Sequence, residues 1–316
     1  MLPWQKAAWD RVGDIERLPH ALLLSGPPGI GKRLFAERLA RRLVCEHTTA
    51  CDACRACRLA ANDNHPDVLI VRPQEGKTEI TVDDARALNQ FLVLTPHLAT
   101  RRVVLVVDAD RLNRSASNAI LKTLEEPPSG SYLLCYLLLV SDAPTRLLPT
   151  IRSRCQNLIL PRPTEEEGLS YLQAHQLPDP GGLLALAHGA PLRALAWPHD
   201  APAMAQRLFA SLEAVALGRD SALEATEAWQ ASDMEMGLAF LTEIAAAVTQ
   251  VALTGTIARG WQGAQEGRLR ALAARLDLEQ MLGLWDEALE TRGLLSAPLD
   301  RRLMWDRLFL HVEPRG

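Results

Sequence analysis

The chain has 316 residues, of which 48% are hydrophobic and 23% charged, a balance typical of globular proteins and unlike that of disordered ones. This length is sufficient for two or three domains. Apolar runs such as Tyr132–Val140 are too short to cross a bilayer, and the first six residues carry no apolar signal region, so we expect a cytoplasmic protein without a membrane partner.

The net charge of −4 is unevenly distributed along the chain. Residues 1–160 carry 21 basic and 17 acidic side chains, whereas residues 161–316 carry 13 basic and 21 acidic ones. One interpretation is ordinary solvated surface in both halves. The other is that any contact with nucleic acid belongs to the first half, because its net positive charge would attract the phosphates.

The first half alternates short apolar runs with amphipathic stretches. Five runs have the length of buried strands, namely Ala21–Ser25, Asp67–Val71, Val103–Val107, Tyr132–Val140 and Asn157–Leu160. Helical spacing is found over Arg33–Val44, Val82–Leu94 and Ser115–Glu126. Thr81, with Asp84 three residues later, is typical of a helix cap. Continuous apolar strands that alternate with helices predict an α/β fold with a parallel sheet covered by helices on both faces.

The pattern changes near residues 161–163. Thr164 and the acidic residues 165–167 have the pattern of a capping box, so we interpret the acidic run as a helix start rather than a binding site. No strand-like run follows. Helices are expected in a small unit at 164–197 and then at 203–217, 222–253, 266–291 and 299–311.

The segment between the first strand and its helix has the spacing of a phosphate-binding P-loop. Gly26, Gly29 and Gly31 would let backbone N–H groups surround phosphate oxygens, and Lys32 would reach the terminal phosphates. The next position normally holds Ser or Thr, whose hydroxyl binds Mg²⁺. Here that position is Arg33, which is not a metal ligand.

A second departure follows the third strand. Asp108 ends the apolar run at the position of the carboxylate that faces the metal in ATPases of this kind. The next residue is Ala109, where many such enzymes have a glutamate that activates water. Together with Arg33, this alanine predicts a site that does not hydrolyse ATP. The presence of Lys32 leaves binding of ATP or ADP open.

Four cysteines, Cys45, Cys51, Cys54 and Cys57, lie within thirteen residues. In a cytosolic protein they are expected to be thiols rather than disulfides. Four thiolates at this spacing can complete a tetrahedral shell around Zn²⁺, and such a closed shell is structural because it leaves no position for a reacting water. The alternative is a group of buried or redox-active cysteines. The cluster forms an insert at about residues 45–57, between the P-loop helix and the next strand.

The segment Leu148–Cys155 lies between the fourth and fifth strands. Arg154 within it is either an ordinary surface charge or an arginine finger, which is a guanidinium offered to the γ-phosphate bound by a neighbouring subunit. Spacing alone does not distinguish these two roles.

Taken together, these motifs resemble the bacterial clamp-loader family of AAA+ proteins. The resemblance rests on the cysteine cluster inside a P-loop domain, the run SNAILKTLEEPP at Ser117–Pro128, and Ser153-Arg154-Cys155. Within the family, the degenerate P-loop, Ala109 and the run Leu148–Cys155 resemble the delta-prime branch. The specific motifs cover about residues 20–160.

The resemblance implies three domains. These are an AAA+ nucleotide-binding-like module at 1–162 that contains the zinc insert, a small helical lid at 163–198, and an all-α collar at 199–316 that joins a five-subunit ring. Leu295–Leu308 is similar to the last collar helix of the family but lacks its usual asparagine.

The resemblance also implies roles for individual residues. The four cysteines match the zinc ligands of the family, although the first spacer is shorter here than is usual. Arg154 would be the finger that completes the site of an adjacent ATPase subunit. Arg193 lies in a segment that resembles the sensor-2 part of the lid, so it would face a bound phosphate, unless it is an ordinary surface residue of the lid. Ser141 lies near the sensor-1 position.

The function implied is that of a non-hydrolysing subunit that helps to load the sliding clamp on primed DNA, as a component of the DNA polymerase III holoenzyme. The implied partners are the gamma/tau ATPase subunits, the delta subunit and, through the assembled complex, the clamp and DNA. One alternative is an active gamma/tau-type ATPase subunit, which should carry Ser or Thr after Lys32 and an intact Asp-Glu pair. Another is a zinc-finger DNA-binding module, for which the acidic second half has no basic recognition helix.

Overall fold

A computed structural model describes residues 1–74, 76–127, 134–198, 200–257, 261, 265–295 and 300–314 of the chain. The chain forms two compact units, residues 1–167 and residues 168–316, and each unit has its own architecture. The finer division into module, lid and collar, with boundaries at 162/163 and 198/199, stays a prediction.

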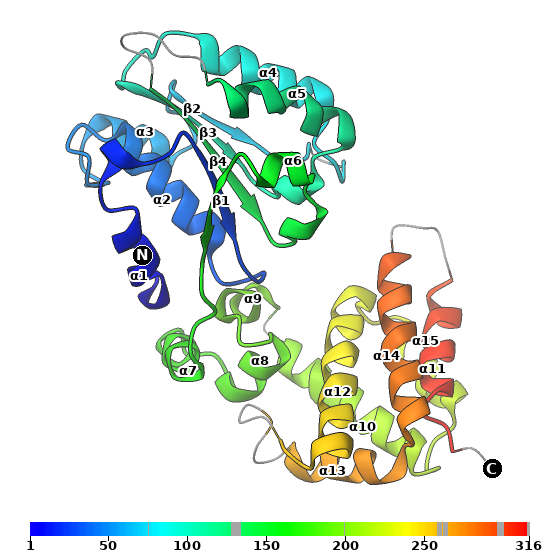
Figure 1. Cartoon of the computed structure of the whole chain (residues 1–316). Coiled ribbons are helices and arrows are strands. Elements are labelled where there is room, and N and C mark those ends of the chain that lie inside the picture. The colour runs from blue at the N-terminus through cyan, green and yellow to red at the C-terminus, as the bar shows by residue number, and fades with distance from the viewer. Residues whose placement is uncertain are drawn as a thin grey trace. The chain divides into compact units, whose positions relative to one another are not determined.

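The first unit contains a five-stranded parallel sheet (Figure 1). Its strands are β1 (Ala21–Ser25), β2 (Val68–Val71), β3 (Arg101–Val106), β4 (Leu134–Ser141) and β5 (Gln156–Ile159). They lie in the order β2-β3-β4-β1-β5. Each strand corresponds to a predicted apolar run, and the first two residues of the fourth run, 132 and 133, lie outside the described residues. All five residues of β1 are buried, and β1 pairs with a strand on each side, which explains its continuous apolar sequence.

Helices cover both faces of this sheet. The helices of the unit are α1 (Lys6–Arg11), α2 (Lys32–Val44), α3 (Arg55–Ala61), α4 (Val82–Val93), α5 (Arg114–Glu125) and α6 (Pro149–Arg152), with short 3-10 turns η1 (Pro3–Gln5), η2 (Ile15–Arg17), η3 (Ala109–Arg111) and η4 (Pro144–Arg146). The helix α2 lies on one face, and the pair α4 and α5 lies on the other (Figure 1). The P-loop joins β1 to α2. This arrangement confirms the predicted α/β fold, with a parallel sheet covered on both faces and a P-loop after its first strand.

Both predicted helix caps are present in the structure. The backbone N–H of Thr81 donates to Oδ2 of Asp84 at 2.8 Å, at the start of α4. The backbone N–H of Thr164 donates to Oε2 of Glu167 at 2.8 Å, and that of Glu167 donates back to Oγ1 of Thr164 at 3.2 Å. The acidic run at 165–167 therefore begins a helix, as the sequence predicts.

The described residues after β5 form helices and connecting loops and contain no strand. The helices are α7 (Glu165–Ala174), α8 (Pro180–Leu186), α9 (Pro191–Ala196), α10 (Ala201–Ala216), α11 (Ala222–Trp229), α12 (Met234–Thr254), α13 (Glu266–Arg275), α14 (Leu278–Gly293) and α15 (Arg301–Leu310). Their buried apolar residues form two clusters. The smaller cluster joins α7, α8 and α9 around Leu172, Leu183 and Leu184, and the larger one joins α10 to α15 around Phe240 and Trp305.

Two helices predicted as continuous are each interrupted. The segment 222–253 divides into α11 and α12, because Asp233 caps a new helix by accepting the N–H of Met236 at 3.1 Å. The segment 266–291 divides into α13 and α14, where Asp277 and Gln280 form a capping box. The similarity noted at Leu295–Leu308 includes residues 296–299, which lie outside the described residues.

Among the described helices, α12 alone has the length and hydropathy of a membrane span. Most of it, 72% of the most apolar window, is buried inside the second unit, and it contacts α10, α13 and α14. A helix that is apolar on all sides and surrounded by other helices is typical of the centre of a helical core.

Candidate functional site

The P-loop backbone has the conformation that its glycine pattern predicts. Gly26, Gly29 and Gly31 have φ angles of 150°, 74° and 88°, values that residues with a side chain rarely adopt. Gly26 also has no space for a side chain, since a Cβ atom there would lie 2.7 Å from the carbonyl oxygen of Leu160. The loop therefore keeps the shape of a phosphate-binding loop.

Lys32, which is predicted to reach terminal phosphates, is buried and already paired. Its side chain is 3% exposed, and its Nζ lies 2.5 Å from Oδ1 of Asp142 and donates to the carbonyl oxygen of Pro27. Asp142 directly follows β4, and its backbone N–H donates to Oδ1 of Asp110 at 3.1 Å. The positive charge that a phosphate would meet is thus neutralised within the chain.

Two residues that the sequence patterns do not mark hold the end of the P-loop. Trp4 Nε1 donates to the carbonyl oxygen of Ile30 at 2.9 Å, and Gln5 Nε2 donates to that of Gly31 at 2.8 Å. Both residues belong to the turn η1, and both side chains are buried. These contacts join residues about 26 positions apart in the chain, so no local motif reveals them.

Arg33 and Asp108 occupy the positions where metal ligands are expected. Arg33 is half exposed, and its Nε lies 2.6 Å from Oε1 of Glu37, one turn further along α2. Burial raises the pKa of Asp108, and the charges of Asp142 and Asp110 raise it further, while the positive charges of Arg111 and, less strongly, Arg33 oppose this rise. Ala109 is fully buried and offers no carboxylate. A permanent cation therefore lies near the carboxylate that would face Mg²⁺.

The four cysteines converge, as a metal site requires. Their Sγ atoms all lie within 4.8 Å of one another, with Cys45 and Cys51 3.7 Å apart and Cys45 and Cys54 4.0 Å apart. Four sulfurs bound at about 2.3 Å to a tetrahedral zinc ion are about 3.8 Å from one another, so these separations fit zinc. The backbone N–H groups of His47, Cys54 and Cys57 donate to sulfur atoms at 3.3 to 3.4 Å.

The electrostatics of the cluster also fit a cation. Burial acts to raise the pKa of Cys45, but hydrogen bonds from three backbone N–H groups outweigh it and lower that pKa to about 5. Burial raises the pKa of Cys57, and the neighbouring thiols Cys45 and Cys54 raise it further. Four thiolates in so small a volume repel one another, and a bound Zn²⁺ removes that repulsion because it stabilises every thiolate. The donor set thus matches a closed structural zinc site.

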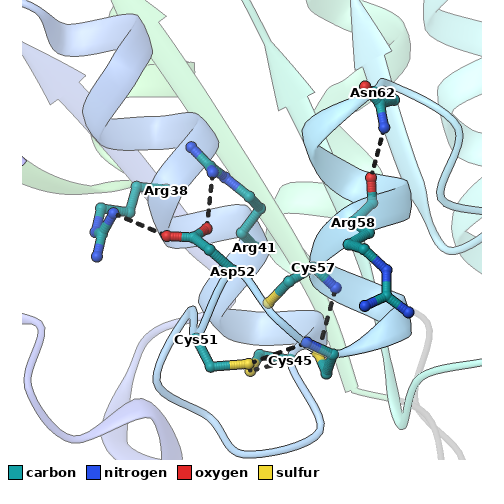
Figure 2. A network of polar contacts seen from close by, with 9 residues as sticks. Arg38, Arg41, Cys45, Cys51, Asp52, Cys57, Arg58 and Asn62 are labelled. Atoms are coloured by element: carbon teal, nitrogen blue, oxygen red, sulfur yellow. Dashed lines mark hydrogen bonds and ion pairs between the residues drawn. The ribbon is translucent and has the colours of Figure 1, made fainter.

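Ion pairs connect the loop that carries the cysteines, at about residues 45–57, to α2. Asp52 accepts a hydrogen bond from Nη1 of Arg41 at 3.0 Å and lies 3.7 Å from Nη1 of Arg38 (Figure 2). Thr48, Ala50 and Asp52 have φ angles of 56°, 55° and 57°, which are costly for residues other than glycine. The insert is therefore a strained loop that its contacts with α2 hold in place.

Arg154 lies on the surface two residues after the end of α6, and its side chain is 32% exposed. Its Nε donates to Oε1 of Glu125 at 2.8 Å, and its Nη1 donates to the carbonyl oxygen of Thr150 at 2.9 Å. Glu125 is the last residue of α5 and belongs to the motif run 117–128. The sequence marks that run as a family feature but gives no sign that Glu125 contacts Arg154.

Arg193 lies on α9 and is half-buried within the second unit. Its guanidinium carbon is 5.7 Å from the ring centre of Trp197. Burial lowers the pKa of Arg193, while the carboxylate of Glu243 on α12 opposes that effect. Its contact with a bound phosphate stays a prediction. Ser141, the residue near the sensor-1 position, is buried and accepts the backbone N–H of Ala143 at 3.2 Å.

Comparison with known proteins identifies the family. The sequence profile of the family described as DNA polymerase III, delta subunit, matches residues 5–164, which are just over half of the chain. The chain belongs to this family. The matched region contains the P-loop, the cysteine cluster and Arg154, so the family relationship covers every candidate residue of the sheet unit.

Curated relatives of this family member are named delta'. The DNA polymerase III subunit delta' of Pseudomonas aeruginosa is 44% identical over 200 residues, which are 61% of this chain and 60% of that protein. The subunit delta' of Escherichia coli is 37% identical over 203 residues, with the same shares of 61% and 60%. The chain thus spans about 60% of the length of these relatives. Their names confirm the delta-prime branch that the motifs predict.

The subunit tau of Bacillus subtilis is also similar, with 32% identity over 154 residues, 48% of this chain and 26% of that protein. Among solved structures, a DNA polymerase III gamma subunit-related protein from Thermotoga maritima covers 98% of each chain, with a TM-score of 0.49 and 22% identity. The RuvB Holliday junction branch migration motor of Thermotoga maritima covers 94% of this chain and 87% of that one, with a TM-score of 0.42 and 15% identity.

Proposed function

We propose that the chain is the non-hydrolysing delta-prime subunit of a DNA polymerase III clamp loader and supplies Arg154 as an arginine finger to a neighbouring ATPase subunit. It assembles in the cytoplasm with gamma/tau and delta subunits and helps to place the sliding clamp on primed DNA. The sheet unit carries the finger, and the helical residues 163–198 and 199–316 serve as lid and collar.

One observation carries this proposal: the chain's own nucleotide site lacks the groups for hydrolysis, while a guanidinium is presented on the surface of the same module. Arg33 replaces the hydroxyl ligand, Ala109 replaces the carboxylate that activates water, and Lys32 is paired internally. Arg154, in contrast, is partly exposed and held by neighbouring groups. Such a module is suited to act on a nucleotide held by another subunit.

The chemistry of a guanidinium suits this role. Arginine is always charged and offers a planar set of N–H donors that match phosphate oxygens, whereas lysine offers only a point charge. Arginine fingers accelerate hydrolysis by about 10³–10⁵ in GTPases. We expect a smaller effect on the whole loader, because its other ATPase sites keep their own fingers.

The test is a loader reconstituted with Arg154→Ala. We expect assembly to be intact and both DNA-stimulated ATP hydrolysis and clamp loading to be slower, with poor rescue by Arg154→Lys. Arg152→Ala is the matched control, because it removes the same charge from an exposed position two residues away and should leave the rates unchanged. Wild-type rates with Arg154→Ala in a fully assembled ring would return Arg154 to the status of a surface charge.

The chain's own site is tested on the isolated protein. We expect no steady ATP turnover, and Arg33→Thr alone should not produce it, because Ala109 still lacks a carboxylate. The similarity to the Bacillus subtilis subunit tau favours a second candidate function, an active gamma/tau-type ATPase subunit. Steady turnover by the pure chain that Lys32→Ala abolishes would support that second candidate and contradict the first.

The cysteine cluster completes the proposal. Cys45, Cys51, Cys54 and Cys57 hold one structural Zn²⁺ that fixes the insert, and their closed shell gives the ion no place in a reaction. The support for zinc is the spacing of the sulfur atoms and the repulsion that a cation would relieve. Binding of ATP or ADP in the degenerate P-loop has no part in the proposed mechanism.

A further inference from the structure

The contacts of Arg154 leave one N–H of its guanidinium available. The group has five N–H donors. The Nε donor and one Nη2 donor go to the same carboxylate oxygen of Glu125, and Nη1 donates to the carbonyl oxygen of Thr150. Nη1 also donates to the hydroxyl oxygen of Ser153 at 3.4 Å, and that hydroxyl donates in turn to the carbonyl oxygen of Thr150. Four of the five N–H donors therefore have acceptors among the described residues, and these contacts leave the second N–H of Nη2 for another acceptor.

This arrangement restricts a side chain that is otherwise free to change rotamer. Glu125 holds one flank of the guanidinium and Thr150 holds the other, so the plane of the group is defined from two sides. Glu125 is 49% exposed and Arg154 is 32% exposed, and an ion pair at such exposure adds little to the stability of the fold. The consequence of the pair is therefore the direction of the guanidinium rather than the stability of the unit.

We propose that Glu125 is a positioning residue that aims the remaining Nη2 N–H of Arg154 at the phosphate of a neighbouring subunit. This inference rests on the proposed function of Arg154. An N–H of a guanidinium points at a phosphate oxygen only if the plane of the group is correct. Glu125 comes from α5 and Arg154 from the segment after α6, so the pair couples two separate elements of the module.

The first test uses the reconstituted loader with Glu125→Ala, Arg154→Ala and the double variant. We expect Glu125→Ala to slow DNA-stimulated ATP hydrolysis by about three- to tenfold, since small errors in placement of a catalytic group are costly. The double variant should match Arg154→Ala alone, because Glu125 acts only through the arginine. Glu126→Ala removes the adjacent exposed carboxylate and is the matched control, with an unchanged rate. Faster hydrolysis with Glu125→Ala, or additive losses, would overturn the proposal.

The second test uses the isolated chain and does not depend on the finger role. The Nε–H of Arg154 should give a distinct NMR signal with slowed exchange in the wild type, and Glu125→Ala should abolish that protection. Glu125→Gln keeps an oxygen acceptor and should retain part of it. If Arg154→Ala leaves the loader at wild-type rates while the NMR result holds, the finger role fails but the pairing stands. If Arg154→Ala slows the loader and Glu125→Ala does not, the positioning role fails and the finger stands.

Discussion

The ammonium of Lys32 lies 2.5 Å from the carboxylate of Asp142, so the P-loop of this chain contains its own counter-anion. In P-loops that bind nucleotides, this lysine pairs with the β- and γ-phosphates. Here a phosphate must displace a carboxylate that is attached to the protein and is therefore always present. The ion pair predicts weak nucleotide binding even though the loop keeps its shape.

Asp142→Asn removes this charge and preserves the size of the side chain. We expect it to tighten binding of ADP to the isolated chain about fivefold, because one unit charge at about 4 Å in water is worth ~1 kcal/mol. Isothermal titration calorimetry measures the change. In a Lys32→Ala background the same substitution should have almost no effect. An affinity that stays the same or falls in the single variant would show that Asp142 does not compete with phosphate.

Asp108→Asn is expected to stabilise the fold at pH 7. Burial and the charge of Asp142 raise the pKa of Asp108 in the folded state. A carboxyl with a raised pKa contributes its full stability below the unfolded pKa of about 3.9 and loses it as the pH rises through the folded pKa. The neutral asparagine avoids that loss.

Urea unfolding of the wild type and Asp108→Asn at several pH values tests the sign of this effect. The difference between the two midpoints should be largest at pH 7 and should disappear as the pH falls toward 4. A variant that is less stable than the wild type at pH 7 would mean that the charged carboxylate is stabilised by its surroundings.

We expect one zinc ion per chain, and we expect Cys54→Ser to release it. Loss of this ligand should increase hydrogen exchange across the insert and α3, while the sheet keeps its circular dichroism because the insert is peripheral to it. Cys155→Ala is the control, since Cys155 is packed in the sheet core, where burial raises its pKa to about 12. That variant should retain the metal. Elemental analysis that finds no zinc in metal-replete wild-type protein would refute the site.

Gly237→Ala is expected to destabilise the second unit by about 2–3 kcal/mol, because it overpacks a full core. A Cβ atom at Gly237 would lie 2.6 Å from Cη2 and 2.8 Å from Cζ2 of Trp305, whose ring is fully buried. Gly267→Ala, in α13, places its Cβ where nothing lies within 4 Å and should stabilise by about 0.5–1 kcal/mol. Chemical denaturation of both variants measures the contrast. If the two substitutions changed the free energy of unfolding equally, α12 and α15 would be able to move apart without loss of stability.

The strands could be predicted from sequence because the sheet is covered on both faces. Every residue of β3 is buried, and its last four residues, Val103–Val106, form a continuous apolar run that differs from the helices around it. The helix cap formed by Thr81 and Asp84 could also be predicted from the sequence, because a cap is a local interaction over three residues. The breaks at Asp233 and Asp277 were not predicted, since a single Asp within an amphipathic stretch is compatible with a continuous helix.

The partners of Lys32 and Arg154 depend on tertiary structure. Asp142 and Glu125 lie at the ends of elements and carry no periodic signal. The strand register supplies the missing information for Asp142, because β1 and β4 pair Ser25 with Ser141 and so bring the residues after both strands together. Knowledge of the strand order would therefore have been sufficient to place Asp142 beside the P-loop.

The order of pairing in the sheet has a consequence for synthesis of the protein. The strand β1 is the first to leave the ribosome, but its neighbours β4 and β5 are the last strands to be made. At about 5–20 residues per second, the roughly 115 residues between Ala21 and its partner Leu137 take about 6–23 seconds. Throughout that interval an apolar strand has both edges unpaired and open to other chains. Translation that stops before residue 156 leaves β1 with at most one neighbour, so truncated products of this chain are expected to aggregate or to require chaperones.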